Sequence, residues 1–181
     1  MNIQNMTTLN DAQRMQAARL LTDSLPLGWP TLADAIQELR ERLIPGNTLL
    51  AAVRDGEVIG WGGILAPSYD GLVFELHPLA VRADQRRRGV GRALVTALED
   101  AARAQGGLTI QLGADDDRDG GETSLANVDL YDDLPRRLQT FNPGTHQSGF
   151  YLKLGYRIIG VMPDANGPGK PDIFFARSLR G

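Results

Sequence analysis

The hydrophobic positions of the chain follow two spacings, one typical of helices and one typical of strands. Spacings of three and four residues predict a helix that is capped by Asn10 or Asp11 and runs to Leu25. A second helix starts after Thr31 and ends before Pro45. Further helices are predicted at residues 90–105 and 146–154, and residues 123–138 are expected to hold one or two short helical turns. The segment 90–105 is the most regular of them, and Gly106 ends it.

Short apolar runs between these segments predict strands. They lie at residues 1–7, 48–54, 58–66, 72–81, 108–112, 156–162 and 173–179. Asp55-Gly56 joins two of them, and this pair favours a tight hairpin turn. Pro78 lies within the fourth run and cannot donate to a sheet ladder, so we expect a bulge or a splay there. The order of elements predicts one α/β domain, residues 1–181, with a mixed sheet.

Composition narrows the possible functions. The chain has 181 residues, 42% of them hydrophobic and 23% charged, as in ordinary globular proteins. The net charge of -3 makes nucleic acid an unfavoured partner. No cysteine is present, which excludes disulfides and a thiolate nucleophile, and two distant histidines do not favour a metal site. The longest apolar run, residues 49–53, is too short to cross a membrane, and no secretory signal is evident, so a cytoplasmic protein is expected.

The clearest local signal is the arginine-glycine loop, residues 86–92, which lies between a strand and a helix. Glycines allow the backbone to approach a ligand, and a helix N-terminus offers unpaired N–H donors, so a phosphate or pyrophosphate fits there. The loop lacks the Gly-Lys-Ser/Thr ending of a Walker A motif. It also has Leu94 where a dinucleotide-binding motif has a third glycine. The alternative is a solvated basic turn.

The pattern Arg86-x-x-Gly89-x-Gly91, after an apolar strand and before an amphipathic helix, resembles the acetyl-CoA pyrophosphate loop of GNAT-superfamily N-acetyltransferases. The order of elements matches that family over nearly the whole chain. The resemblance implies a mixed, mostly antiparallel central sheet flanked by helices. It implies that Leu79 and Val81 pair with the pantetheine arm of acetyl-CoA through their main chain. The residues implied to hold the pyrophosphate are Arg86, Arg87, Arg88, Gly89, Val90, Gly91 and Arg92.

A narrower resemblance covers the second half of the chain. Five segments are similar, in this order, to one branch of the aminoglycoside 6′-N-acetyltransferases: residues 74–79, 112–116, 150–156, 163–167 and 170–173. The resemblance implies a polycationic substrate and a homodimer. Two departures fall on the substrate side. The acidic loop, residues 115–122, is about two residues longer, and residues 146–149 read His-Gln-Ser-Gly in place of His-Pro-Tyr-Glu or similar.

Candidate catalytic groups lie on the fourth strand. Alternation places Glu75 and His77 on one face. Glu75 is suited to accept a proton from the incoming ammonium, directly or through water, and His77 to orient that water or the carboxylate. A bulge at Pro78 would aim the Leu79 N–H at the thioester oxygen as a one-donor oxyanion site, a role that the resemblance also implies. The alternatives are a solvated glutamate and a structural histidine.

Three further positions complete the candidate site. The resemblance implies that Tyr151 protonates the sulfur of CoA; the alternative is a helix residue that packs on the sheet. Dense carboxylates in the acidic loop would be relieved by a polycation, and the motif favours Asp115 and Asp116 as substrate contacts. The alternative is a solvated, mobile loop. Trp29 is either a wall of the same pocket or a core residue.

The leading hypothesis is an acetyl-CoA-dependent acetylation of the 6′-amine of aminoglycosides. Direct attack in a ternary complex is favoured, since the sequence shows no cysteine and no obvious Ser-His pair for an acyl-enzyme. One alternative is a GNAT enzyme for a polyamine or a peptide amine. Others are a non-catalytic protein that binds acyl-CoA or the drug, and a plain nucleotide-binding module.

Overall fold

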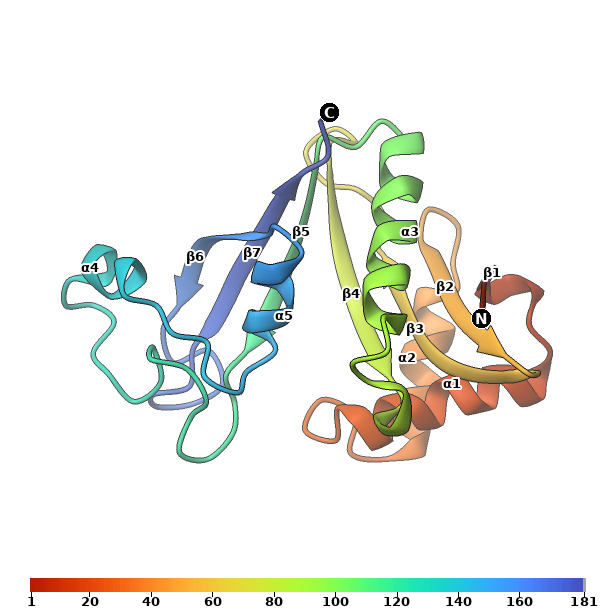
Figure 1. Ribbon diagram of the computed structural model, residues 1–181, viewed down its shortest axis with the longest axis horizontal. Coiled ribbons are helices and arrows are strands. Elements are labelled where there is room, and N and C mark those ends of the chain that lie inside the picture. Colours follow the sequence, from red (N-terminus) through yellow and green to blue (C-terminus); the bar gives the residue numbers. More distant parts are fainter. Residues whose placement is uncertain (181) are drawn as a thin grey trace. The chain divides into compact units, whose positions relative to one another are not determined.

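The computed structural model describes residues 1–180 and contains helices and strands close to the predicted positions (Figure 1). The helices are α1 (Asp11–Ser24), α2 (Leu32–Arg42), α3 (Val90–Ala104), α4 (Leu134–Gln139) and α5 (Ser148–Lys153). The strands are β1 (Asn2–Asn5), β2 (Thr48–Arg54), β3 (Glu57–Ile64), β4 (Val73–Val81), β5 (Thr109–Asp115), β6 (Arg157–Met162) and β7 (Asp172–Ser178). Short 3-10 helices lie at Met6–Thr8 (η1) and Ala83–Gln85 (η2). The strand order β1-β2-β3-β4-β5-β7-β6 confirms a mixed α/β fold with a mostly antiparallel sheet.

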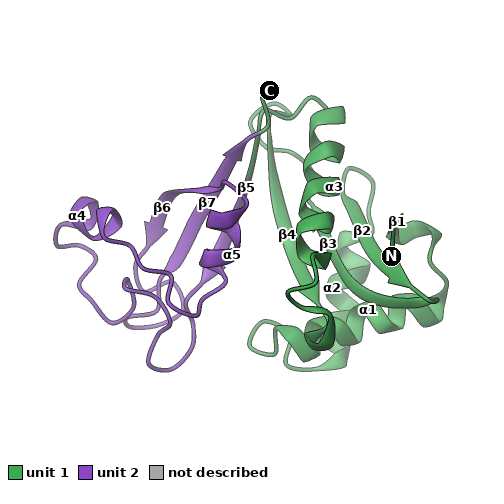
Figure 2. Ribbon diagram, viewed as in Figure 1, with its two compact units in different colours: residues 1–110, 179–181 green, residues 111–178 purple. Residues whose placement is uncertain are grey.

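The chain forms two compact units (Figure 2). The first comprises residues 1–110 together with Leu179 and Arg180, and the second comprises residues 111–178. The last residues of the chain return to the first unit, where the backbone N–H of Leu179 donates to Leu108 O at 2.8 Å. The first unit holds the arginine-glycine loop and the fourth predicted strand, and the second holds the acidic loop.

Local signals in the sequence set the ends of the first helices. Asn10 caps α1 through a capping box with Gln13, and Thr31 caps α2 through a capping box with Asp34. The Asp55-Gly56 turn has positive φ at both residues, 52° and 83°, as the predicted hairpin requires. These predictions are confirmed.

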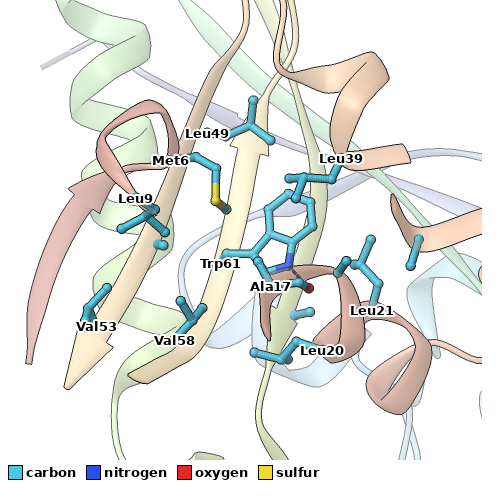
Figure 3. Packing of buried hydrophobic residues seen from close by; sticks show 14 residues of the cluster. Met6, Leu9, Ala17, Leu20, Leu21, Leu39, Leu49, Val53, Val58 and Trp61 are labelled. Atoms are coloured by element: carbon cyan, nitrogen blue, oxygen red, sulfur yellow. Dashed lines mark hydrogen bonds between the residues drawn. The ribbon is translucent and has the colours of Figure 1, made fainter. Parts of the chain in front are cut away.

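The core of the first unit lies on both faces of β2 and β3. On one face, buried side chains of α1 and α2 surround Trp61, whose Nε1 donates to Ala17 O at 2.8 Å (Figure 3). On the other face, Val90 and Leu94 of α3 pack against Ala52 and Ile59. Alternating residues of the same strands therefore serve the two helical layers.

Glycines of β3 permit the close approach of β4. Gly62 pairs with Leu79 and Ile64 pairs with Leu76, so Gly63 alone lies opposite His77 and Pro78. This register shift is the predicted bulge at Pro78. A Cβ atom at Gly62 would lie 2.9 Å from Pro78 O, and one at Gly63 would lie 2.9 Å from His77 O. Only glycine fits both positions, a requirement that the sequence analysis did not identify.

Some predicted elements differ from the structure. The first strand ends at Asn5, because Asn5 caps a 3-10 turn by accepting from Thr7 N. Strand β5 continues to Asp115, three residues beyond its predicted end. The short helical segment expected within residues 123–138 is α4, which begins after Asp133, whose side chain accepts from Arg136 N. The last predicted helix is shorter at both ends, Ser148–Lys153.

Candidate active site

The arginine-glycine loop ends on the first turn of α3. Gly89 occupies the N-cap position in the left-handed region, with φ 85° and ψ -2°. No side chain within the described residues caps this helix end, and a Cβ at Gly89 would meet no atom within 4 Å. The first N–H groups of α3 are therefore left without a side-chain cap, as an anion site at a helix N-terminus requires.

The arginines of this segment have different tasks. Arg86 Nε donates to Val81 O at 3.0 Å and so ties the loop to the end of β4, while the side chains of Arg87, Arg88 and Arg92 are exposed. Just before the loop, Arg82 binds Glu57 and Asp84. The hydrogen bond to Asp84, followed by that to Glu57, raises the pKa of Arg82, and the same bond from Arg82 lowers the pKa of Asp84.

Strand β4 presents its candidate catalytic side chains on one side. Phe74 and Leu76 are buried, whereas Glu75 is exposed and His77 is half-buried, which is the alternation that the sequence predicts. No hydrogen bond or ion pair to the Glu75 carboxylate occurs among residues 1–180, so this group is open to a ligand. Leu79 follows the bulge directly.

His77 is held by two groups of its own unit. Its Nε2 lies 3.3 Å from Glu38 Oε1 of α2. The Trp29 ring lies 5.8 Å from the imidazole, centroid to centroid, with an angle of 52° between the planes. Trp29 also packs against the core cluster of the first unit, as the core interpretation expects.

The carboxylates of the acidic loop have unequal environments. Asp116 is fully buried, and its two oxygens accept from Glu122 N and Thr123 N at 2.8 Å each. Its geometry is that of a loop anchor. Asp119 pairs with Lys170 at 2.8 Å, which lowers the pKa of Asp119. Asp115 is exposed and accepts from Asn166 Nδ2 at 2.6 Å.

Burial also affects a carboxyl group and a phenol in the second unit. It raises the pKa of Asp117, which lies within the acidic loop, above its ordinary value. Tyr151 is 5% exposed and makes edge-to-face contacts with Phe150 and Tyr156. Burial raises the pKa of Tyr151, so its hydroxyl keeps its proton at any pH at which the protein would work. That is the protonation state a general acid needs.

Comparison with known proteins decides the family. Residues 14–121 match the model of the acetyltransferase (GNAT) family. The chain belongs to the GNAT acetyltransferase family. A crystal structure of an aminoglycoside 6′-N-acetyltransferase complexed with coenzyme A is 36% identical to this chain, covers 100% of it and 98% of its own length, and superposes with a TM-score of 0.90.

Two further solved structures are similar to this GNAT chain. The aminoglycoside 6′-N-acetyltransferase from Enterococcus faecium is 35% identical, with 100% and 98% of the two chains covered and a TM-score of 0.88. An aminoglycoside 6′-acetyltransferase of type Ii is 31% identical, with 100% and 99% covered and a TM-score of 0.77. No curated relative matches the chain.

The residues of this acetyltransferase fit a diphosphate at the start of α3. The left-handed N-cap at Gly89, the open space beside it and the exposed arginines together provide N–H donors and positive charge. Among residues 1–180, no group of three or more His, Asp or Glu side chains is placed to hold a metal ion. No helix in the same range is long and apolar enough to span a membrane.

The structure brings together a serine and a histidine that the sequence does not pair in an obvious way. The structure does contain a Ser-His pair: Ser148 Oγ lies 2.6 Å from His146 Nδ1, and His146 Nε2 lies 2.9 Å from Asp115 O. Sequence reasoning missed it because the two residues come together only through the tight turn before α5. Ser148 is fully buried, so its hydroxyl is not presented to a substrate. The pair instead stabilises the end of β5 through the contact of His146 with Asp115 O.

Sequence reasoning also missed Glu38 and Gln85. Gln85 is buried at the base of the arginine-glycine loop, where its Oε1 accepts from Arg54 at 2.7 Å. Glu38 stands four residues before Arg42 on α2, a spacing that predicts a helical ion pair, and nothing in the sequence ties it to His77.

Proposed function

We propose that this GNAT protein is an acetyl-CoA-dependent aminoglycoside 6′-N-acetyltransferase that transfers the acetyl group directly in a ternary complex. The observation that carries the proposal is full-length similarity, at 31–36% identity, to three aminoglycoside 6′-acetyltransferase structures, one of them complexed with coenzyme A. The open N-terminus of α3 and the unpartnered Glu75 carboxylate support it from the chain's own geometry.

The residues of the first unit fit the donor side of the reaction. Acetyl-CoA supplies an activated acyl group as a thioester. The N–H groups of residues 86–92 bind its diphosphate, and the main chain at Leu79 and Val81 aligns its pantetheine arm along β4. The Leu79 N–H, next to the bulge, stabilises the negative charge that develops on the carbonyl oxygen.

Proton transfers follow from the same assignment. The amine nitrogen forms a bond to the carbonyl carbon, and the carbon–sulfur bond breaks. Glu75 takes the proton that the ammonium loses, directly or through a water that His77 orients. Tyr151, whose buried hydroxyl keeps its proton, gives a proton to the departing thiolate. The nitrogen loses its second proton as the amide forms, and this proton, carried by solvent, restores the hydroxyl of Tyr151, so the amide and Tyr151 both end neutral.

The substrate side is assigned to carboxylates and one aromatic ring. Asp115 and Asp119 are both exposed, but Asp119 is paired with Lys170, so Asp115 is the better placed to receive an ammonium group. Asp116 belongs to the same motif, and its buried bonds to the loop backbone hold the loop in shape. Trp29 lies beside His77 and is suited to a sugar face.

The wider proposal concerns the setting of the enzyme. We propose one acetyltransferase domain over residues 1–181, a homodimer, and a cytoplasmic role in aminoglycoside resistance. Strand β6 is at the end of the sheet order and carries the exposed side chains of Ile159 and Met162, which suits an interface.

A thiol-release assay tests the activity. Purified protein is mixed with acetyl-CoA and matched aminoglycosides that bear either a 6′-amine or a 6′-hydroxyl group, and free CoA is followed with time. Turnover restricted to the 6′-amine compounds is expected. Turnover only with polyamines or peptide amines would redirect the proposal to another acceptor, and binding without turnover would leave a sequestering protein.

A further inference from the structure

A carboxylate of α2 lies behind the histidine of the catalytic strand. Glu38 is only 11% exposed at its side chain, and its Oε1 faces His77 Nε2 at 3.3 Å. The same oxygen accepts from Arg42 Nε at 2.7 Å. All three residues belong to the first unit, so the arrangement is internal to one compact body (Figure 2).

The contacts around His77 restrict its ring on two sides. Glu38 lies at Nε2, and the Trp29 ring lies against the imidazole with centroids 5.8 Å apart. An ionised carboxylate only accepts hydrogen bonds, so the ring nitrogen that faces it carries a hydrogen. In the neutral ring the other nitrogen, Nδ1, is then an acceptor.

Arg42 keeps the Glu38 carboxylate in place. It lies four residues along the same helix, where i,i+4 pairs meet. The Asn47 side chain donates to Arg42 O at 3.0 Å and so steadies the end of α2 that carries the pair. The carboxylate is therefore fixed before any ligand arrives.

We infer that Glu38 is a positioning residue for acetyl transfer: it fixes His77 with Nε2–H toward α2, so that Nδ1 serves as the acceptor for the incoming amine or its water. The inference rests on the proposed function for its catalytic consequence. Glu38 itself touches no reacting atom, and no proton passes to it. The proton of the ammonium goes to Glu75, and His77 only orients the group that loses it.

Kinetics of Glu38→Gln test the catalytic consequence. This change keeps the shape of the side chain and removes the charge that selects the His77 tautomer. We expect kcat to fall about 10- to 100-fold while the KM for acetyl-CoA stays within about twofold, because positioning partners act on the chemical step. The matched control is Glu41→Gln on the same helix, where the carboxylate is exposed and accepts from Gln37, and its kcat should not change.

A double-mutant cycle shows whether Glu38 acts through His77. If it does, Glu38→Gln adds nothing to His77→Ala, and the double variant matches His77→Ala within about twofold. Multiplying losses would overturn the inference, as would wild-type kcat in Glu38→Gln. Thermal melts of each variant establish that the measured protein is folded.

Nitrogen-15 NMR of the free protein tests the geometry without any substrate. The chain has two histidines, and His146 Nε2 faces the carbonyl of Asp115, so His146 serves as an internal Nε2–H reference. In alkaline buffer, His77 should show the Nε2–H tautomer in the wild type, and its Nδ1 signal should move toward the tautomer average in Glu38→Gln. A wild-type His77 with its hydrogen on Nδ1 overturns the inference even if the variant does not fold. If the wild type does not acetylate aminoglycosides, the proposed function fails, while the NMR result still decides the contact.

Discussion

Individual carboxylates of this chain differ more in environment than in sequence. Asp115 and Asp116 are neighbours in one motif, yet the first is exposed and the second is fully buried with both oxygens bonded to the loop backbone. Asp119 forms an ion pair with Lys170, which balances its charge. The number of carboxylates in the sequence therefore overstates the negative charge available to a cationic ligand. Asp115 is the carboxylate for which we predict a contact with the substrate.

Asp115→Asn should weaken binding of the aminoglycoside and leave binding of acetyl-CoA unchanged. The amide keeps an acceptor for Asn166 but loses the charge that a bound ammonium would meet, and a charge-assisted hydrogen bond contributes about 1.5–3 kcal/mol. We expect the KM for the aminoglycoside to rise at least about tenfold, with an unchanged KM for acetyl-CoA. Asp119→Asn is the control in steady-state kinetics. Equal effects of the two changes would mean that the loop acts only through its overall charge.

Glu75→Gln should remove the proton acceptor without disturbing β4, since its side chain is exposed and has no partner among residues 1–180. A general base contributes about 10²- to 10⁴-fold, so we expect turnover to fall at least about 10²-fold. The measurement is kcat against pH for the wild type and the variant, and the two profiles should differ in shape. A variant with the wild-type pH–rate profile would show that another group is the base.

Tyr151→Phe separates acid catalysis from packing. The ring keeps its edge-to-face contacts with Phe150 and Tyr156, and only the hydroxyl is lost. Because burial raises the pKa of Tyr151, the wild-type acid should remain protonated beyond pH of about 10, the ordinary value for tyrosine. We expect kcat to fall at least about tenfold, with little change in the Kd for acetyl-CoA measured by calorimetry. Parallel losses in kcat and binding would assign the residue to packing.

At the scale of elements, features that depend on adjacent residues could be predicted from the sequence. The capping boxes at Asn10 and Thr31, the Asp55-Gly56 hairpin and the bulge at Pro78 all follow from local chemistry, and the structure confirms them. Contacts across the fold could not be predicted. Glu38 meets His77 only because α2 lies against β4, and Gly62 is needed only because Pro78 O lies so close.

The start of α3 offers a prediction with an internal control. Gly89 and Gly106 flank the helix with the same φ of 85°, and neither has an atom within 4 Å of a built Cβ. Alanine at either position should lower stability by about 1–2 kcal/mol, the cost of a left-handed L-residue. Only Gly89→Ala should also weaken the binding of coenzyme A. We expect its calorimetric Kd to rise about 5- to 10-fold, because the strained loop spends part of its time in another conformation. Equal Kd values for the two variants would show that the diphosphate does not bind at the N-terminus of α3.

For the whole molecule, the division of tasks follows the chain. The first unit contains the arginine-glycine loop and the catalytic strand, and the chain leaves it through β5 and returns at Leu179, which bonds to Leu108. The residues between, 111–178, carry the acidic loop and Tyr151. The GNAT family model ends at residue 121, so most of the second unit lies beyond the matched region.

Binding of coenzyme A should therefore be visible as stabilisation of the folded chain, independent of any acceptor. A ligand that binds only the native state at 100 times its Kd stabilises it by about 2.7 kcal/mol, which for a chain of this size raises the thermal midpoint by about 5–10 °C. Differential scanning calorimetry measures this, and at the same coenzyme A concentration Gly89→Ala should show a smaller rise than Gly106→Ala. If millimolar coenzyme A does not shift the midpoint, the chain does not bind the donor of the proposed reaction. The roles assigned to Leu79, Val81 and the arginine-glycine loop would then be wrong.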